Sequence, residues 1–173
     1  MKLTAFILLL LASVPLSLHS QVGNVVQNVT LLNAYDEKTS LPFIGKEVFL
    51  IFDMDPDRQH IVDPLTESLT NGELSSGNFG VITVLNCKDT WMPYFAIRTG
   101  VKGELKKYPG SVILLDKNNT LPKAWGLGDC DNAAAILVVG RDSRIKFCRI
   151  VRSEDECSKA IGEIHNVINN ETR

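Results

Sequence analysis

The stretch FLIFDMDPDRQH, residues 49–60, decides the fold, because an apolar strand runs directly into a cluster of charged residues. Its first four residues form an unbroken apolar run, which is typical of a strand buried on both faces. The charged residues that follow are Asp53, Asp55, Asp57, Arg58 and His60. Such a cluster fits a calcium loop, the nucleophile loop of a phosphatase, or the former active site of another fold.

The chain on either side of this stretch alternates between strand-like and helix-like segments. The predicted strands are Val29–Leu32, Val48–Phe52, Gly80–Leu85, Val112–Leu115, Ala135–Val139 and Ile145–Ile150. The predicted helices are Ile61–Thr70, Trp91–Lys107 and Ser153–Asn169, the last with Ser153 as its N-cap. The turn 140–143 joins the last two strands as an antiparallel hairpin. The pattern therefore predicts a mixed α/β sheet with helices on both faces.

Composition narrows the class of protein. The chain has 173 residues, 45% of them apolar, with a net charge of −2, which is typical of one globular domain. We expect no nucleic-acid partner, because the chain carries no excess of positive charge.

The N-terminus has the features of an export signal. Residues 1–20, MKLTAFILLLLASVPLSLHS, combine Lys2, an apolar core and small residues near Ser20. That apolar core is short for a membrane span, which takes about 20 residues. We therefore expect a cleaved signal peptide over 1–20, a single mature domain over 21–173, a periplasmic or secreted location, and no stable membrane insertion after cleavage.

Two interpretations fit this cluster of charged residues, called the acidic cluster below, poorly. A calcium loop starting at Asp53 needs Gly and Glu where this chain has Arg58 and Pro64. The cluster also resembles the motif of haloacid-dehalogenase-type phosphatases, which implies Asp53 as nucleophile, Asp55 as acid/base and bound magnesium. GLGDCDNAAA, residues 126–135, is similar to that family's downstream acidic motif. The following Pro56 departs from the family's pattern, because it removes a backbone donor at the phosphate site.

The third interpretation covers nearly the whole mature chain. VGNVVQNVTLLNAYDEKTSLPFIGKEVFLIF, residues 22–52, resembles the opening of thioredoxin-like proteins of the thiol-disulfide/peroxiredoxin type. SVILLDKNNTLPKAWGL, residues 111–127, is similar to their strand–turn–short-helix insertion, and residues 133–147 to their closing hairpin. Residues 105–129 with that hairpin are most similar to the periplasmic YtfJ family. The resemblance implies a thioredoxin-like mixed sheet with this insertion.

On that fold the usual dithiol site is missing. Asp57 and His60 fall where the cysteine pair would lie, the chain has no C-x-x-C, and residues 132–135 contain no counterpart of the proline that usually opens the hairpin strand. We expect a binding site here instead, formed by Asp55, Asp57, Arg58, His60 and Ala133. The competing interpretation is structural, because acidic residues cap helices and stabilise their N-termini.

The four cysteines would lie near one another on such a fold. The resemblance implies the pairs Cys148–Cys157 and Cys87–Cys130 as structural disulfides. One bridge with two buried thiols, or a labile Cys87–Cys130 redox pair, remain as alternatives.

The function expected from the sequence is binding. We expect an exported thioredoxin-like binding or accessory protein, with a small ligand or a protein as partner and with no metal or cofactor. The first alternative is a thiol-disulfide oxidoreductase that uses Cys87 and Cys130. The second is a magnesium-dependent phosphatase that uses Asp53 and Asp55. The sequence does not decide whether the protein is an enzyme.

Overall fold

The sheet is built around β3 (Val48–Met54), the strand that ends in the acidic cluster. The computed structural model describes residues 21–72, 79–88 and 90–173. Every residue of β3 is buried. β3 pairs in parallel with β4 (Phe79–Asn86) and antiparallel with β6 (Ala134–Val139), so both of its edges are hydrogen-bonded. The apolar run in the sequence is therefore a central strand, as predicted.

The complete sheet is mixed. Its strand order is β2-β1-β5-β4-β3-β6-β7. The remaining strands are β1 (Thr30–Leu32), β2 (Lys38–Ser40), β5 (Val112–Asp116) and β7 (Ile145–Val151). β4 and β5 are parallel, and β6 and β7 form the predicted antiparallel hairpin. Its turn closes where the Ser143 backbone N–H donates to the Gly140 carbonyl at 3.0 Å.

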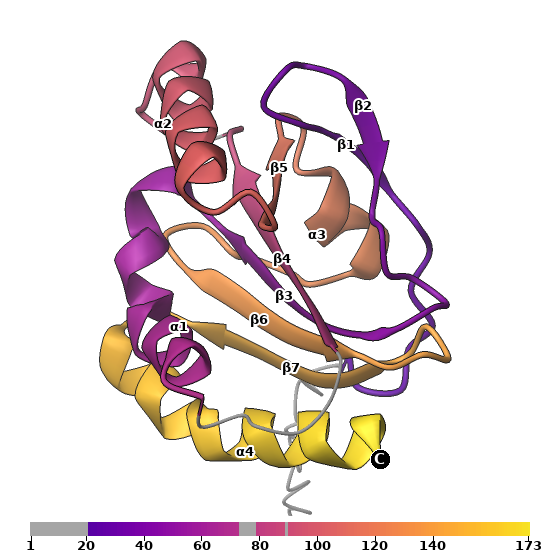
Figure 1. Cartoon of the computed structure of the whole chain (residues 1–173). Helices are drawn as coiled ribbons and strands as arrows, with labels where there is room; N and C mark the ends of the chain where they lie inside the picture. The colour runs from indigo at the N-terminus through magenta and orange to yellow at the C-terminus, as the bar shows by residue number, and fades with distance from the viewer. Residues whose placement is uncertain (1–20, 73–78, 89) are drawn as a thin grey trace, which may run out of the picture.

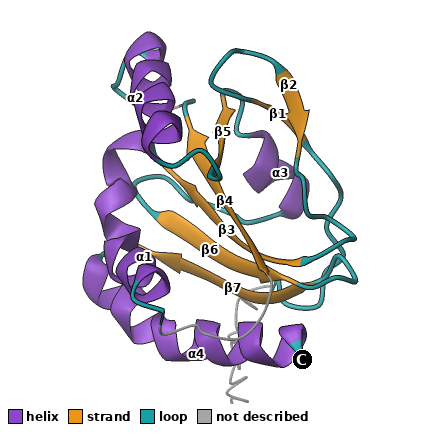
Figure 2. Cartoon of the chain, viewed as in Figure 1, coloured by secondary structure: helices purple, strands orange, loops and turns teal. Residues whose placement is uncertain are grey.

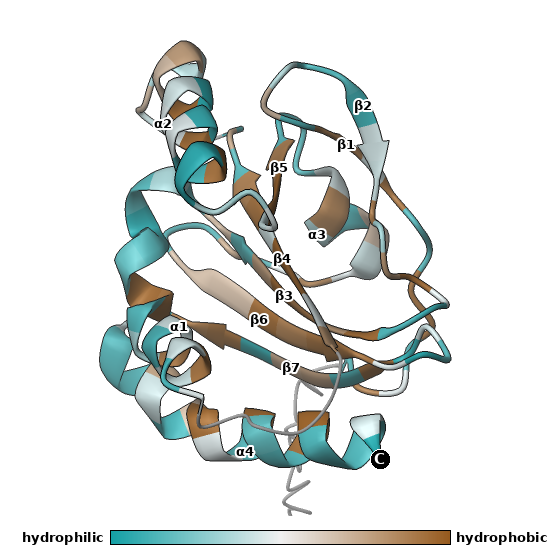
Figure 3. Cartoon of the chain, in the orientation of Figure 1, coloured by the Kyte–Doolittle hydropathy of each residue, from teal (hydrophilic) through white to brown (hydrophobic). Residues whose placement is uncertain are grey.

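Helices cover both faces of the sheet (Figure 1, Figure 2). The α1/α4 face carries α1 (Asp63–Thr70), α2 (Tyr94–Lys107) and α4 (Glu154–Thr172), whose apolar residues pack in one core layer. The α3 face carries α3 (Thr120–Trp125) and the segment before β3, which form a second layer. Figure 3 shows hydrophobic residues concentrated in the strands and along the inner sides of the helices. The prediction of a mixed sheet with helices on both faces is confirmed.

Alternation along β3 decides which layer each side chain joins. Leu50, Phe52 and Met54 belong to the core layer on the α1/α4 face, whereas Phe49 and Ile51 belong to the layer on the α3 face. Because successive side chains of a strand point to opposite faces, the next residue, Asp53, lies on the α3 face. A carboxyl group is thus placed inside an apolar core layer.

Several local details differ from the predicted elements, among them the start of α2 at Tyr94 and the end of α4 at Thr172. The predicted helix 61–70 is preceded by a 3-10 turn, η1 (Pro56–Val62), and α1 begins only at Asp63. Pro64 lies in the first turn of α1, where its missing N–H costs no helical hydrogen bond. β2 was not predicted, because three mostly exposed residues carry no apolar alternation. The N-cap of α4 is confirmed, since the Ser153 hydroxyl accepts from the backbone N–H of Glu156 at 3.3 Å.

Within the described residues, no helix combines the length and the apolar character needed to cross a membrane.

Candidate functional site

Asp53, at the end of the central strand, is completely buried. Neither of its carboxyl oxygens has a hydrogen-bond partner. Burial, reinforced by the nearby charges of Asp116 and Asp55, raises the pKa of Asp53 from 3.8 to about 8. The carboxyl group therefore keeps its proton at neutral pH. A protonated and inaccessible group cannot attack a phosphate ester, so the geometry does not fit the phosphatase interpretation.

The next acidic residue, Asp55, joins the loop after β3 to the loop before β6. Its Oδ2 accepts from the Asn132 backbone N–H at 2.9 Å. Arg58 Nη2 donates to Asn132 Oδ1 at 2.7 Å, which adds a second link between the same two loops. These contacts connect η1 to the loop before β6, and the first gives the buried carboxylate of Asp55 a hydrogen-bond partner.

The other residues of the predicted binding site lie at the same end of the sheet. Asp57 accepts a hydrogen bond from Trp91 Nε1 at 3.1 Å, and His60 is exposed on η1. Ala133 has no exposed surface, so a ligand cannot reach its side chain. The structure places the predicted residues at one end of the sheet. Their hydrogen bonds include those to Asn132 and Trp91 in neighbouring loops, so these side chains are engaged within the protein.

The cysteines do not form the predicted pairs. All four are free thiols in the structure. Cys87 and Cys157 pack in the core layer on the α1/α4 face, whereas Cys130 and Cys148 pack in the layer on the α3 face. Each predicted pair, Cys148–Cys157 and Cys87–Cys130, therefore has one member on each face of the sheet. This corrects the expectation from the sequence, which placed the cysteines by their end of the sheet and ignored the face.

The environment of Cys87 and Cys130 does not favour thiol chemistry. Burial, with the charge of Asp116, raises the pKa of Cys87 to about 12. Burial, with the charge of Asp53, raises the pKa of Cys130 to about 12. Reactive cysteines need the opposite shift, because the thiolate is the nucleophile. Among the described residues, no three or more Cys, His, Asp or Glu side chains are grouped to hold a metal ion.

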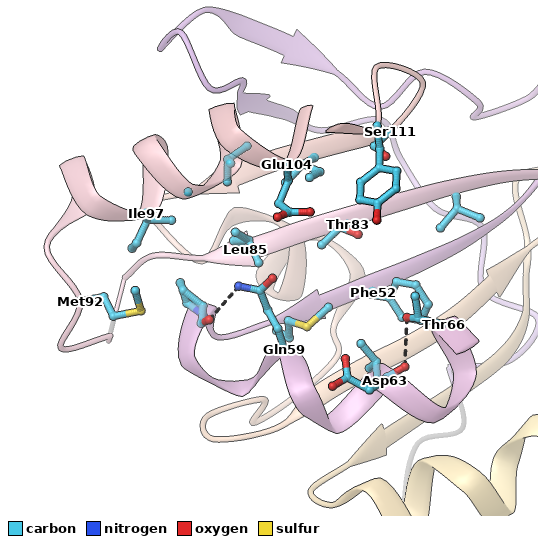
Figure 4. Close-up of a pocket in the computed structure, with 18 of the residues that line it drawn as sticks. Phe52, Gln59, Asp63, Thr66, Thr83, Leu85, Met92, Ile97, Glu104 and Ser111 are labelled. Atoms are coloured by element: carbon cyan, nitrogen blue, oxygen red, sulfur yellow. Dashed lines mark hydrogen bonds between the residues drawn. The ribbon is translucent and has the colours of Figure 1, made fainter. Parts of the chain in front are cut away.

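A pocket of about 590 Å³ opens on the α1/α4 face, between α1 and α2 (Figure 4). Its floor consists of side chains from β3, β4 and β5, and its walls are the facing sides of η1, α1 and α2. This volume lies within the range of about 300–1,000 Å³ that is usual for small-molecule sites. The lining residues are Phe52, Met54, Pro56, Gln59, Val62, Asp63, Thr66, Leu69, Val81, Thr83, Leu85, Met92, Ala96, Ile97, Gly100, Val101, Glu104, Tyr108, Ser111 and Ile113.

The pocket exists because α2 presents small residues to the sheet. Ala96 and Gly100 lie one turn apart on the lining side of α2, and a Cβ added at Gly100 would meet no atom within 4 Å. Opposite them, Phe52, Thr83 and Ile113 are register partners on three neighbouring strands and form a continuous floor. The helix therefore covers the sheet without filling the space above it.

Sequence reasoning missed this pocket. The segment η1 after β3 contributes Pro56, Gln59 and Val62 to it, and none of the predicted binding residues lines it. The signal that the sequence did contain is the pair Ala96 and Gly100, spaced four residues apart on a predicted helix.

Solved structures with the same arrangement of strands and helices identify the fold. A thioredoxin-like protein from Porphyromonas gingivalis matches with a TM-score of 0.58 and 14% identity, over 86% of this chain and 94% of that one. The thioredoxin domain of a thiol-disulfide oxidoreductase from Bacteroides vulgatus matches with a TM-score of 0.54 and 14% identity, over 84% and 98%. A peroxiredoxin-like protein from Aquifex aeolicus gives 0.50 and 14%, over 83% and 86%. The fold is therefore thioredoxin-like.

The chain belongs to a family described as "Bacterial protein of unknown function (YtfJ_HI0045)", whose model matches residues 17–168. This confirms the resemblance drawn from the sequence. No curated protein matches the chain.

Proposed function

We propose that this protein is an exported, thioredoxin-like binding or accessory protein that holds a small apolar ligand in the pocket between α1 and α2. The observation that carries the proposal is the pocket itself, about 590 Å³ in volume and floored by apolar side chains of three strands. Buried apolar surface contributes about 25 cal/mol per Å² to binding, so such a floor favours an apolar ligand.

The thiols support a binding role over thiol-disulfide exchange. The chain has no C-x-x-C, and the pKa values of Cys87 and Cys130 are raised to about 12. A thiol that holds its proton at neutral pH is a poor nucleophile. The proposed function is therefore binding rather than redox catalysis.

Export is supported by the signal-like residues 1–20. The test is expression of the full chain in a Gram-negative host, followed by fractionation and N-terminal sequencing. A periplasmic product that begins near Gln21 is expected, and an uncleaved product in the cytoplasm would contradict export.

Ligand binding is tested with N-phenyl-1-naphthylamine, an apolar dye whose fluorescence rises when it leaves water. The purified protein should give a saturable rise. Gly100→Leu places a side chain in the pocket and should weaken dye binding at least tenfold, because the leucine occupies the space of the ligand.

The matched control is Gly103→Leu. Gly103 also lies on α2 and also has open space at its Cβ position, but it does not line the pocket. Both substitutions raise helix propensity by about 1 kcal/mol, so neither should unfold α2. Equal dye binding by the two variants, or no saturable binding by the wild type, would refute the proposal.

A further inference from the structure

The charged residues that line the pocket are all acidic. Asp63 at the start of α1 and Glu104 on α2 face the space from opposite walls, and Figure 4 shows the carboxylate of Glu104 directed between the two helices. Among the described lining residues there is no lysine, arginine or histidine. An anionic ligand group would meet two like charges here, whereas a cationic group would meet two opposite ones.

Among the described ion pairs, one engages a carboxylate of the pocket. Lys107 Nζ contacts Glu104 Oε1 at 3.0 Å, with side chains that are 66% and 46% exposed. An exposed pair of this kind holds together weakly, so the lysine does not compete strongly with a bound cation. Lys107 does not line the pocket, and none of the described ion pairs involves Asp63.

The pocket is elongated along α2. Its lining residues on this helix extend from Ala96 to Glu104, which is about 12 Å at a rise of 1.5 Å per residue, and Met92 and Tyr108 lie beyond the two ends of the helix. Most side chains between these ends are apolar or small. The shape suits a linear hydrocarbon chain that lies along the helix with its head group near the acidic residues.

The backbone around the pocket disfavours an extended peptide as the occupant. The floor presents the faces of its strands to the pocket, and its central strands, β3 and β4, are hydrogen-bonded to neighbours on both edges. A peptide strand needs free backbone partners along its length, which the edge of a sheet supplies and its face does not. A hydrocarbon chain has no such need.

From this geometry we infer that the pocket binds a linear amphiphile with a cationic, amine-type head group. This inference rests on the proposed function, because it names the ligand class of the same pocket. It adds that Asp63 and Glu104 select the head group, while the strands of the floor contact the hydrocarbon chain.

Isothermal titration calorimetry with three ligands of equal chain length tests the inference. Dodecylammonium, dodecanol and dodecanoate are each titrated into the full-length mature protein at neutral pH, below the micelle concentrations of the two ions and the solubility limit of dodecanol. Two partly screened charge pairs correspond to about a tenfold effect on affinity. Dodecylammonium should therefore bind at least tenfold more tightly than dodecanoate, with dodecanol between them.

Two variants test whether the carboxylates of Glu104 and Asp63 cause the preference for the cationic head group. Glu104→Gln and Asp63→Asn should each weaken dodecylammonium binding severalfold and leave dodecanol binding unchanged. The control is Glu67→Gln, since Glu67 is an exposed acidic residue on α1 that does not line the pocket. It should bind all three ligands as the wild type does, and circular dichroism verifies that every variant is folded.

The outcomes separate this inference from the proposed function. Equal affinity for the three ligands, or tighter binding of dodecanoate, would overturn the head-group assignment and leave an apolar binding pocket in place. No binding of any of them, together with no dye binding, would overturn both. An ammonium preference that Glu67→Gln lowers as much as Glu104→Gln would also overturn the assignment, because it would reflect overall charge only.

Discussion

Replacing Asp53 by asparagine is expected to remove most of the pH dependence of stability between about pH 5 and pH 8. Asp53 is fully buried without a hydrogen-bond partner, and the pKa of its carboxyl group is raised to about 8 in the folded protein. In the unfolded chain the same group ionises near its ordinary pKa of 3.8. Between these two values the folded protein holds one proton that the unfolded chain has released.

The sign and the magnitude follow from this difference. Because the unfolded chain binds fewer protons, the free energy of unfolding falls as pH rises above about 4 and levels off above about 8. The slope is about 1.4 kcal/mol per pH unit, so Asp53 alone should cost about 4 kcal/mol between about pH 5 and pH 8. The asparagine side chain of the variant does not titrate. Its unpartnered amide lowers the free energy of unfolding by the same amount at every pH. The plot of this free energy against pH is therefore displaced, and its slope does not change.

The assay is urea unfolding followed by circular dichroism at half-unit pH steps, for the wild type and Asp53→Asn. The control is Glu67→Gln, which removes an exposed carboxylate and should keep the slope of the wild type. If the stability of the wild type and of Asp53→Asn depended on pH with the same slope, the reasoning would be refuted. That result would mean that the Asp53 carboxyl group is ionised in the folded protein.

Three smaller perturbations test other parts of the structure. Gly80→Ala should destabilise the protein by about 1–3 kcal/mol in urea unfolding, because its Cβ would overlap the ring of Phe43, whereas Gly110→Ala, with open space at the same position, should not. Ser153→Ala should cost about 1 kcal/mol through loss of the α4 N-cap, and an unchanged unfolding midpoint would contradict this. At pH 8 the thiolate fraction of Cys87, with a pKa of about 12, is about 1,000-fold below that of an ordinary cysteine. Iodoacetamide labelling with peptide mass spectrometry should therefore be correspondingly slower in the folded protein than in urea, and equal rates would contradict the shift.

The strands were predictable from sequence because their signals are local. Each of the six predicted strands is found in the structure with boundaries shifted by no more than two residues, since long apolar runs bounded by turn residues leave few alternatives. The boundary between η1 and α1 was less clear from the sequence. Pro64 is acceptable in the first turn of a helix and also between two helical segments, so it does not show which of the two is present.

The site was not predictable in the same way. The position of a cysteine along a strand gives its end of the sheet directly, but the face depends on strand register and on which helix covers it. Cys148 pairs with Leu137 and so joins the layer on the α3 face, while Cys157 lies on α4 across the sheet. The pocket needed still more information, because it depends on side chains from three strands and three helical segments.

The acidic cluster and the pocket are nevertheless connected through one contact. The hydrogen bond from Trp91 to Asp57 joins the segment before α2 to η1, and η1 leads directly into α1. The links from Asp55 and Arg58 to Asn132 fix η1 in turn against the loop that precedes β6. The polar residues after β3 therefore link the start of α1 to the segment before α2. Because these helices are the two walls of the pocket, the cluster contributes to its shape without lining it.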